Sequence, residues 1–233
     1  MVGCGEWGIN FKHPIAEGND LPTRTERVPT WFGLVIFAVV LSSIAPFNLY
    51  AQVSVELGPT VGFYASATDT EGPNANPFSG VATKWKQLPA VAYGGEATVW
   101  IGGRIGIGGA YLYSPSDVRN GANSTGHESA SVQIASVRAT YGFEVGNNRV
   151  YLSGGVGRIK RGGSAYEDLN GNEDTAALAG VGNTLRLARH LRINIGVDAL
   201  FYSLQLKSST TTFPSHSQVD FVGRLGLVYR VGG

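Results

Sequence analysis

Two short stretches of the sequence carry residue types that could perform chemistry. The first, His127-Glu128-Ser129, brings together an imidazole, a carboxylate and a hydroxyl, the groups with which a hydrolase activates a serine. A catalytic triad is defined by its geometry, and three adjacent residues in a loop at a strand edge do not meet as a triad. We therefore expect hydrophilic loop residues here and at His216-Ser217, and no catalytic site.

The second stretch, Asp168 to Asp174, places oxygen-bearing side chains at alternate positions, like the start of a calcium-binding loop. Its glycine stands at the wrong position, and the twelfth position is Ala179 rather than glutamate. We expect a solvated polar loop. The sequence contains no phosphate-binding loop, dinucleotide fingerprint or HExxH pattern, and it predicts no metal site and no cofactor.

Composition narrows the class of protein. Glycine accounts for 33 of 233 residues, about twice the usual share, while charged residues make up 15% against a usual ~25%. Hydrophobic residues make up 43%, which excludes a disordered chain, and the net charge of +1 gives no basic field for nucleic acid. Cys4 is the only cysteine, which excludes a disulfide framework within the chain.

The N-terminal region has the features of an export signal. The apolar run Trp31 to Leu41 follows Arg24 and Arg27, and it is shorter than the ~20 residues of a spanning helix. We expect residues 1–51 to be an N-terminal extension plus a signal peptide, with a hydrophobic region at about 31–46 and cleavage near Ala51. The alternative is an anchor that is never cleaved.

After Ala51 the sequence alternates between apolar and polar residues, which is typical of strands with two different faces. Each expected strand is long enough to cross a bilayer at a tilt. The fourth changes phase at Ala135-Ser136, where we expect a β-bulge. The eight expected strands are 53–64, 88–101, 104–114, 129–144, 149–158, 175–189, 191–202 and 219–231.

The connections between these strands alternate between long and short. The long ones are 65–87, 115–128, 159–174 and 205–216, and the short ones are Gly102-Gly103, Gly146-Asn147-Asn148 and Arg189-His190. All long loops therefore leave from one end of an up-and-down meander, which is the layout of an outer-membrane barrel. The apolar faces carry almost no charge, whereas the other faces carry glycine and isolated charges. Residues 52–233 are thus predicted to form an all-β, eight-stranded antiparallel transmembrane barrel with its apolar face toward lipid.

Two sets of residues follow from this placement. Charged residues on the predicted lumen face must pair, because unpaired buried charges are costly. The predicted lumen salt-bridge network is Glu56, Glu96, Arg104, Arg138, Arg186, Arg192, Asp198, Asp220, Arg224 and Arg230, with Glu56–Arg230 as the favoured pair. Aromatic residues near both strand ends predict two interfacial girdles. The girdle set is Phe63, Tyr111, Tyr113, Tyr141, Phe143, Phe201, Phe221 and Tyr229.

On these features residues 52–233 resemble the small eight-stranded outer-membrane barrels of OmpA-like and OmpX-like type. Members of that family usually end in an aromatic residue that the barrel-assembly machinery recognises. This chain has Tyr229 in its last strand but ends in Val231 and two glycines, which departs from that signal. The resemblance implies a monomer in the outer membrane, delivered by Sec export, with membrane lipid and the assembly machinery as partners.

The resulting functional expectation is a structural or surface-display role, with adhesion to a surface ligand through the four long loops. A non-enzymatic protein is expected. Three alternatives stay open: a lipid-modifying outer-membrane enzyme, a small porin-like solute channel that uses the lumen charges as an ion path, and a secreted lipocalin-like binding barrel.

Overall fold

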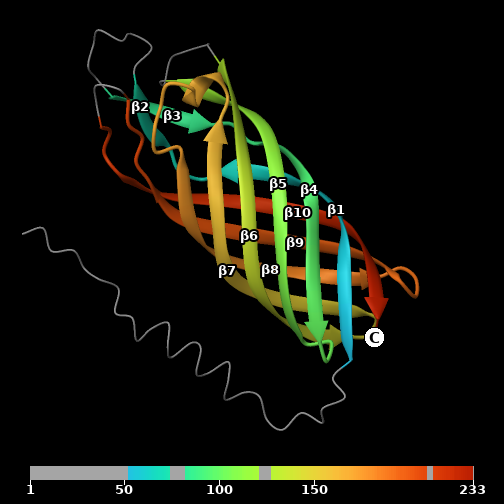
Figure 1. The fold of residues 1–233 in the computed structure, drawn as a ribbon. Coiled ribbons are helices and arrows are strands. Elements are labelled where there is room, and N and C mark those ends of the chain that lie inside the picture. The colour runs from blue at the N-terminus through green and yellow to red at the C-terminus, as the bar shows by residue number, and fades with distance from the viewer. Residues whose placement is uncertain (1–51, 74–81, 121–126, 209–211, 233) are drawn as a thin grey trace, which may run out of the picture. The chain divides into compact units, whose positions relative to one another are not determined.

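The computed structural model describes residues 52–73, 82–120, 127–208 and 212–232. The predicted signal peptide and its cleavage point near Ala51 lie outside these residues. The described chain forms a closed antiparallel β-barrel, with its eight ring strands running between two ends (Figure 1). No helix among the described residues is long and apolar enough to cross a membrane.

Eight strands form the ring, and each pairs antiparallel with the strands on both sides. β1 lies between β4 and β10, and the pairing of β5 with β6 closes the circle. The ring strands are β1 (Val53–Ser66), β4 (Ala90–Ile101), β5 (Ile105–Asn120), β6 (His127–Val145), β7 (Asn148–Gly162), β8 (Glu173–Arg186), β9 (Leu191–Leu204) and β10 (His216–Gly232). This arrangement confirms the predicted fold class and the order of all eight strands.

The short connections follow the prediction at two of three places. Gly102, Gly103 and Gly146 have positive φ angles between 61° and 70°, a conformation that glycine adopts without steric cost. The third connection is longer than Arg189-His190, because β8 ends at Arg186. The amides of Leu187 and Ala188 both donate to the carbonyl of Leu191, which turns the chain before β9 begins.

Part of the segment between β1 and β4, where a loop was expected, is β-structure. It contains a hairpin of β2 (Thr70–Pro73) and β3 (Ala82–Gln87), and β3 pairs with β5 at Val118–Asn120. The hairpin lies at the end of the barrel opposite to the chain's C-terminus (Figure 1). A short helix, η1 (Ser164–Tyr166), occupies another predicted loop. Strands β5, β6, β7 and β10 also extend further toward the loops than predicted.

The bulge predicted at Ala135-Ser136 is wrong. β6 pairs with β5 in one unbroken register from Ile105↔Tyr141 to Arg119↔His127, and its pairing with β7 is equally continuous. The apolar residues Val132 and Ile134 simply face inward, because the barrel interior becomes apolar toward the loops. The change of phase in the sequence therefore reflects an interior that becomes apolar toward the loops, and not an extra residue in the strand.

The two faces of the wall differ as predicted. Large apolar side chains face outward along the ring strands, among them Val137 and Val145 of β6, each 60% exposed. The interior holds buried charges from the short turns to the middle of the barrel, and toward the loops it holds an apolar core. A wall that is apolar outside and charged inside is suited to lipid as its solvent.

Arginine substitutions on β6 test the lipid-facing orientation. Val137 lies between the two predicted girdles, whereas Val145 lies at the short-turn end of the strand. We expect Val137→Arg to destabilise the barrel by ~2–4 kcal/mol and Val145→Arg by only ~0–1 kcal/mol, because the cost of a lipid-facing charge depends on its depth. Urea unfolding in lipid vesicles measures both. Equal, negligible effects would mean that this face contacts water.

Candidate functional site

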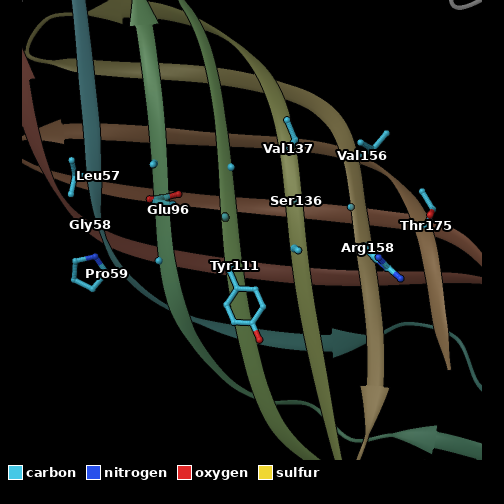
Figure 2. Close-up of a pocket in the computed structure, with 16 residues that line it drawn as sticks. Leu57, Gly58, Pro59, Glu96, Tyr111, Ser136, Val137, Val156, Arg158 and Thr175 are labelled. Atoms are coloured by element: carbon cyan, nitrogen blue, oxygen red, sulfur yellow. The ribbon is translucent and has the colours of Figure 1, made fainter.

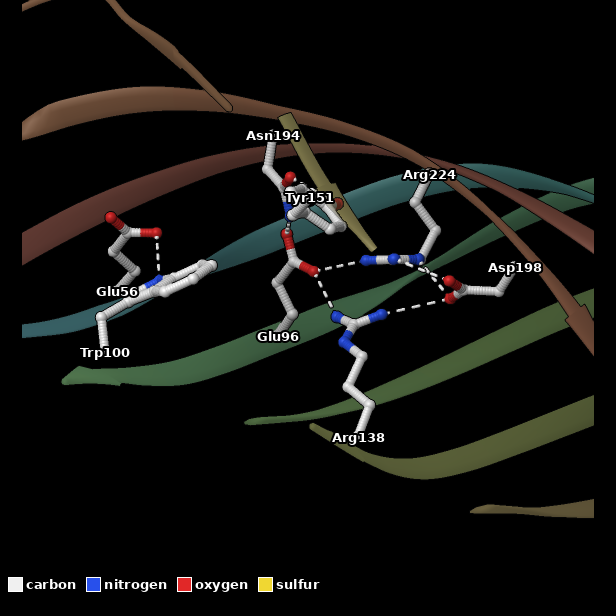
Figure 3. Close-up of polar contacts among 8 residues, drawn as sticks. All are labelled: Glu56, Glu96, Trp100, Arg138, Tyr151, Asn194, Asp198 and Arg224. Carbon is white, nitrogen blue, oxygen red and sulfur yellow. Dashed lines mark hydrogen bonds and ion pairs between the residues drawn. The ribbon is translucent and has the colours of Figure 1, made fainter. Parts of the chain in front are cut away.

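The centre of the barrel holds four charges that compensate one another. Glu96 of β4, Arg138 of β6, Asp198 of β9 and Arg224 of β10 are each at most 6% exposed. Arg138 donates to Glu96 at 2.8 Å and to Asp198 at 3.1 Å, and Arg224 donates to Glu96 at 2.6 Å and to Asp198 at 3.0 Å (Figure 3). Each carboxylate therefore touches both guanidinium groups. We call these four residues the central charge layer.

Neutral groups complete this layer. Asn194 donates to the second oxygen of Glu96 at 2.6 Å and accepts a hydrogen bond from the Tyr151 hydroxyl at 2.8 Å (Figure 3). Gly226 leaves room for Glu96, since a Cβ atom there would lie 2.5 Å from the carboxylate. The abundance of glycine on the inner face thus has a physical reason, because eight strands leave a narrow interior.

A second group of charges lies nearer the short turns. Glu56 accepts a hydrogen bond from the Trp100 indole at 2.8 Å and pairs with Arg149 at 3.4 Å and Arg192 at 3.5 Å. The guanidinium of Arg149 also lies 4.2 Å from the centre of the Trp100 ring. We call this group the lower charge layer. The predicted ion pair of Glu56 with Arg230 is wrong: the two residues lie opposite each other in the β1–β10 register, but Glu56 pairs with Arg149 and Arg192.

A third group lies toward the loops. Asp220 is completely buried, lies 3.2 Å from Arg161, and accepts hydrogen bonds from Tyr64 at 2.7 Å and Tyr202 at 2.5 Å. Arg161 also contacts the Tyr202 hydroxyl. We call this group the upper charge layer. Apolar side chains separate the upper layer from the central layer. On the inner face of β9, Leu200 lies between Asp198 and Tyr202, and on the inner face of β10, Val222 lies between Asp220 and Arg224.

Most of the predicted lumen charges lie in these layers. Seven are buried: Glu56, Glu96, Arg138, Arg192, Asp198, Asp220 and Arg224. The placement of Arg104 and Arg186 in the lumen is wrong, because Arg104 lies in the turn before β5 and Arg186 ends β8, and both are exposed. Arg230 is half-buried near the end of β10.

Sequence reasoning missed two buried arginines. Arg149 and Arg161 are each 1% exposed, and both belong to β7. They stand on the same face as Tyr151, since all three are separated by even numbers of residues. Continuing this alternation to residue 161, where a loop was expected, would have found Arg161.

The predicted girdle residues face outward. Seven are 44–52% exposed, and Tyr113 is half-buried beside Tyr93, with ring centres 5.5 Å apart. Tyr93 is outward-facing and was not predicted. At the short-turn end, Tyr141 and Phe143 make an edge contact at 4.9 Å, and His190 stacks on Tyr229 at 5.7 Å.

The two stretches that suggested chemistry do not assemble a site. His127 and Ser129 lie on the outward face of β6, and Glu128 lies on the other face at the strand's exposed end. In Asp168 to Asp174, the backbone of Asn170 pairs with Lys207, while Asp174 turns inward at the start of β8. Over the described ranges, no three acidic, histidine or cysteine side chains are grouped so that they could hold a metal ion.

Burial affects the acidity of two groups on the loop side. Asp174 lies on the loop side of the girdle, because it is three residues closer to the loops than Ala177, which is opposite the girdle residue Phe201. Burial raises the pKa of the Asp174 carboxyl, and the charge of Arg161 only partly opposes this. Burial likewise raises the pKa of the Tyr166 hydroxyl, again against the effect of Arg161. The carboxylate form of Asp174 is therefore disfavoured in the folded barrel.

Comparison of structures finds known proteins that are similar to this chain. No family model and no curated protein matches the sequence. The outer membrane protein OprG from Pseudomonas aeruginosa matches 78% of this chain and 96% of its own, with 13% identity and a TM-score of 0.53. The outer membrane protein AlkL matches 78% of this chain and 90% of its own, also with 13% identity and a TM-score of 0.53.

The structures of OprG and AlkL define the fold class. The chain has the fold of the small eight-stranded outer-membrane β-barrels, as its resemblance to them predicted. The Escherichia coli outer membrane protein W is also similar, with 18% identity over 79% of this chain and all of its own, at a TM-score of 0.42.

Removal of one central charge tests the coupling of the layer. We expect Arg224→Met to destabilise the barrel by ~3–5 kcal/mol, because it leaves buried carboxylates without a full set of partners. Arg158→Gln, which removes an exposed pair with Glu173 at 2.6 Å, is the control and should cost at most ~1 kcal/mol. Denaturant unfolding compares the two variants, and equal losses would contradict a coupled central layer.

Asp174 gives a pH-dependent prediction. Its folded pKa is raised, so the folded state binds a proton that the unfolded state releases, and stability falls as pH rises through that window. Asp174→Asn should therefore stabilise the barrel at neutral pH and have no such effect at acidic pH, where the wild-type carboxyl is protonated. Unfolding temperatures at both pH values measure the difference, and a destabilised variant at neutral pH would contradict the prediction.

Proposed function

We propose that the protein is a monomeric, non-enzymatic outer-membrane barrel that presents its long-loop end to a surface ligand. The observation that carries this proposal is the filled interior. Three charge layers and an apolar core occupy the barrel from the short turns to the loops. The cavity between the lower and central layers measures only about 20 Å³, enough for a single water molecule.

The loop-side core supports a display role over a channel. Trp85 of β3, Tyr166 of η1 and Phe213 are each at most 6% exposed, although all three come from segments expected to be loops. The rings of Trp85 and Tyr166 meet edge to face at 5.8 Å, and the Tyr166 hydroxyl donates to Gln87 at 2.8 Å. Segments from separate connections are thus held together on a rigid base, an arrangement typical of binding surfaces.

The outward apolar wall supports a membrane location over a secreted binding barrel. A soluble barrel directs its apolar face inward and would not expose a continuous band of large apolar residues. In this proposal the barrel reaches the outer membrane by Sec export, with cleavage near Ala51, and the barrel-assembly machinery inserts it into lipid. His127, Glu128 and Ser129 serve as polar surface residues in this proposal.

Single cysteines introduced at the two ends test the proposed topology. Ser164 lies in η1 on the loop side, and Asn147 lies in a short turn, and both are exposed. We expect a membrane-impermeant maleimide to label Ser164→Cys on intact cells, and to label Asn147→Cys only after the cells are broken. The matched pair reports orientation, because each variant is the accessibility control for the other.

Other outcomes would favour the alternatives. Labelling of Asn147→Cys alone on intact cells would invert the topology, and recovery without detergent would indicate a soluble barrel. Stepwise conductance of the folded wild-type barrel in planar bilayers would support a solute channel. A change in lipid A structure that is lost when His127, Ser129 and His216 are replaced by alanine would support an enzyme.

A further inference from the structure

A broad apolar groove crosses the outer wall of the barrel (Figure 2). Its volume is about 1010 Å³, and its lining runs from Leu57 and Pro59 on β1 to Thr175 on β8. These strands are the ends of a run of six neighbours in the ring. Since neighbouring strands lie ~4.8 Å apart, the groove extends ~24 Å around the wall. It is therefore wider than a single extended hydrocarbon chain needs.

The groove is hollow because its outward residues differ in size. Ala97 and Gly109 lie opposite each other on β4 and β5, and Ala135 of β6 lies opposite Tyr111 in the neighbouring row. Larger side chains, Tyr111 and Val137, stand beside them and project from the wall (Figure 2). A hollow of this kind on a lipid-facing wall accepts hydrocarbon, because dispersion contacts need partner atoms to fill the space.

One charged side chain stands outward at the loop-side margin of the groove. Arg158 of β7 lies in the same cross-strand row as Tyr111 and Ala135, and its side chain is 69% exposed. Glu173 lies 2.6 Å from its Nε, and a guanidinium has five N–H donors, so donors remain for a second anion. Glu96, which also lines the groove, directs its carboxylate into the central charge layer.

A second cation lies two residues further toward the loops. Lys160 is exposed on the same face of β7, in the row of the girdle residue Tyr113 and opposite Glu173. Two cations therefore face one carboxylate at the interfacial level, directly beside an apolar groove. This combination matches a molecule with hydrocarbon chains and an anionic headgroup, since Arg and Lys near the interface bind phosphate.

We propose that this groove binds a multiply acylated, phosphorylated lipid of the leaflet on the loop side. Its acyl chains lie across the small residues Ala97, Gly109 and Ala135, and its phosphate contacts Arg158 and Lys160. The width of the groove favours a lipid with several chains over one with two. The inference rests on the proposed outer-membrane location, because that location determines which leaflet the loops face.

Lipid retention by the folded, full-length barrel tests the proposal. The barrel is folded in phosphatidylcholine nanodiscs with a minority of bisphosphorylated lipid A, and heat-dependent gel mobility shows that each variant is folded. Native mass spectrometry after detergent release then counts the retained lipid A. We expect Ala135→Leu, which fills the groove, and Arg158→Gln, which removes the cation, to lower the retained fraction about tenfold.

Two variants outside the groove are the matched controls. Ala199→Leu adds the same side chain on β9, which does not line the groove, and Arg186→Gln removes an exposed arginine at the short-turn end. Both should retain lipid A like the wild type. Equal retention by all four variants, or equal retention of phosphatidylglycerol in place of lipid A, would overturn the proposal. A barrel that folds in nanodiscs without retaining lipid A contradicts only the groove, whereas failure to fold in lipid contradicts the proposed function.

Discussion

Charge compensation inside a closed ring is the condition on which this structure depends. Eight strands enclose a space too narrow for water to solvate charged groups, so every carboxylate directed inward needs a partner from another strand. Glu96 and Asp198 each contact both Arg138 and Arg224, and these residues come from β4, β6, β9 and β10. The central layer therefore links strands across the whole barrel and sets which faces can point inward. With those faces determined, the alternate residues of each strand must face lipid.

The interior changes from charged to apolar along the barrel axis. Ion pairs dominate from the short turns to the middle, and apolar packing dominates toward the loops, with the upper charge layer enclosed in it. This change allows strands β5, β6 and β7 to continue beyond the lipid-facing band while staying ordered. It also gives the β2–β3 hairpin and η1 an apolar surface on which to pack. In the proposed display role, these packed segments form the base of the binding surface.

The alternation of residue types predicted most of the wall but less of the interior. Period-two patterning predicted the strand order, the outward direction of the girdle residues and the buried positions of seven of the ten lumen charges. Arg104 and Arg186 were misplaced because alternation does not show where a strand ends and a turn exposes the next side chain. The bulge in β6 was predicted because inward Val132 and Ile134 resemble lipid-facing residues in sequence. A pattern of two classes cannot distinguish apolar residues that meet lipid from those that meet a core.

The sequence by itself determined the class of fold, because hairpin turns and strand alternation are local properties that each segment expresses independently. Only the tertiary structure decided which charges pair, because partners such as Arg149 and Glu56 are 93 residues apart and meet through ring closure. It also decided that Glu56 pairs with Arg149 and Arg192 rather than with Arg230 directly opposite. Inward side chains cross the narrow interior and reach distant strands, so adjacency in the register does not establish contact.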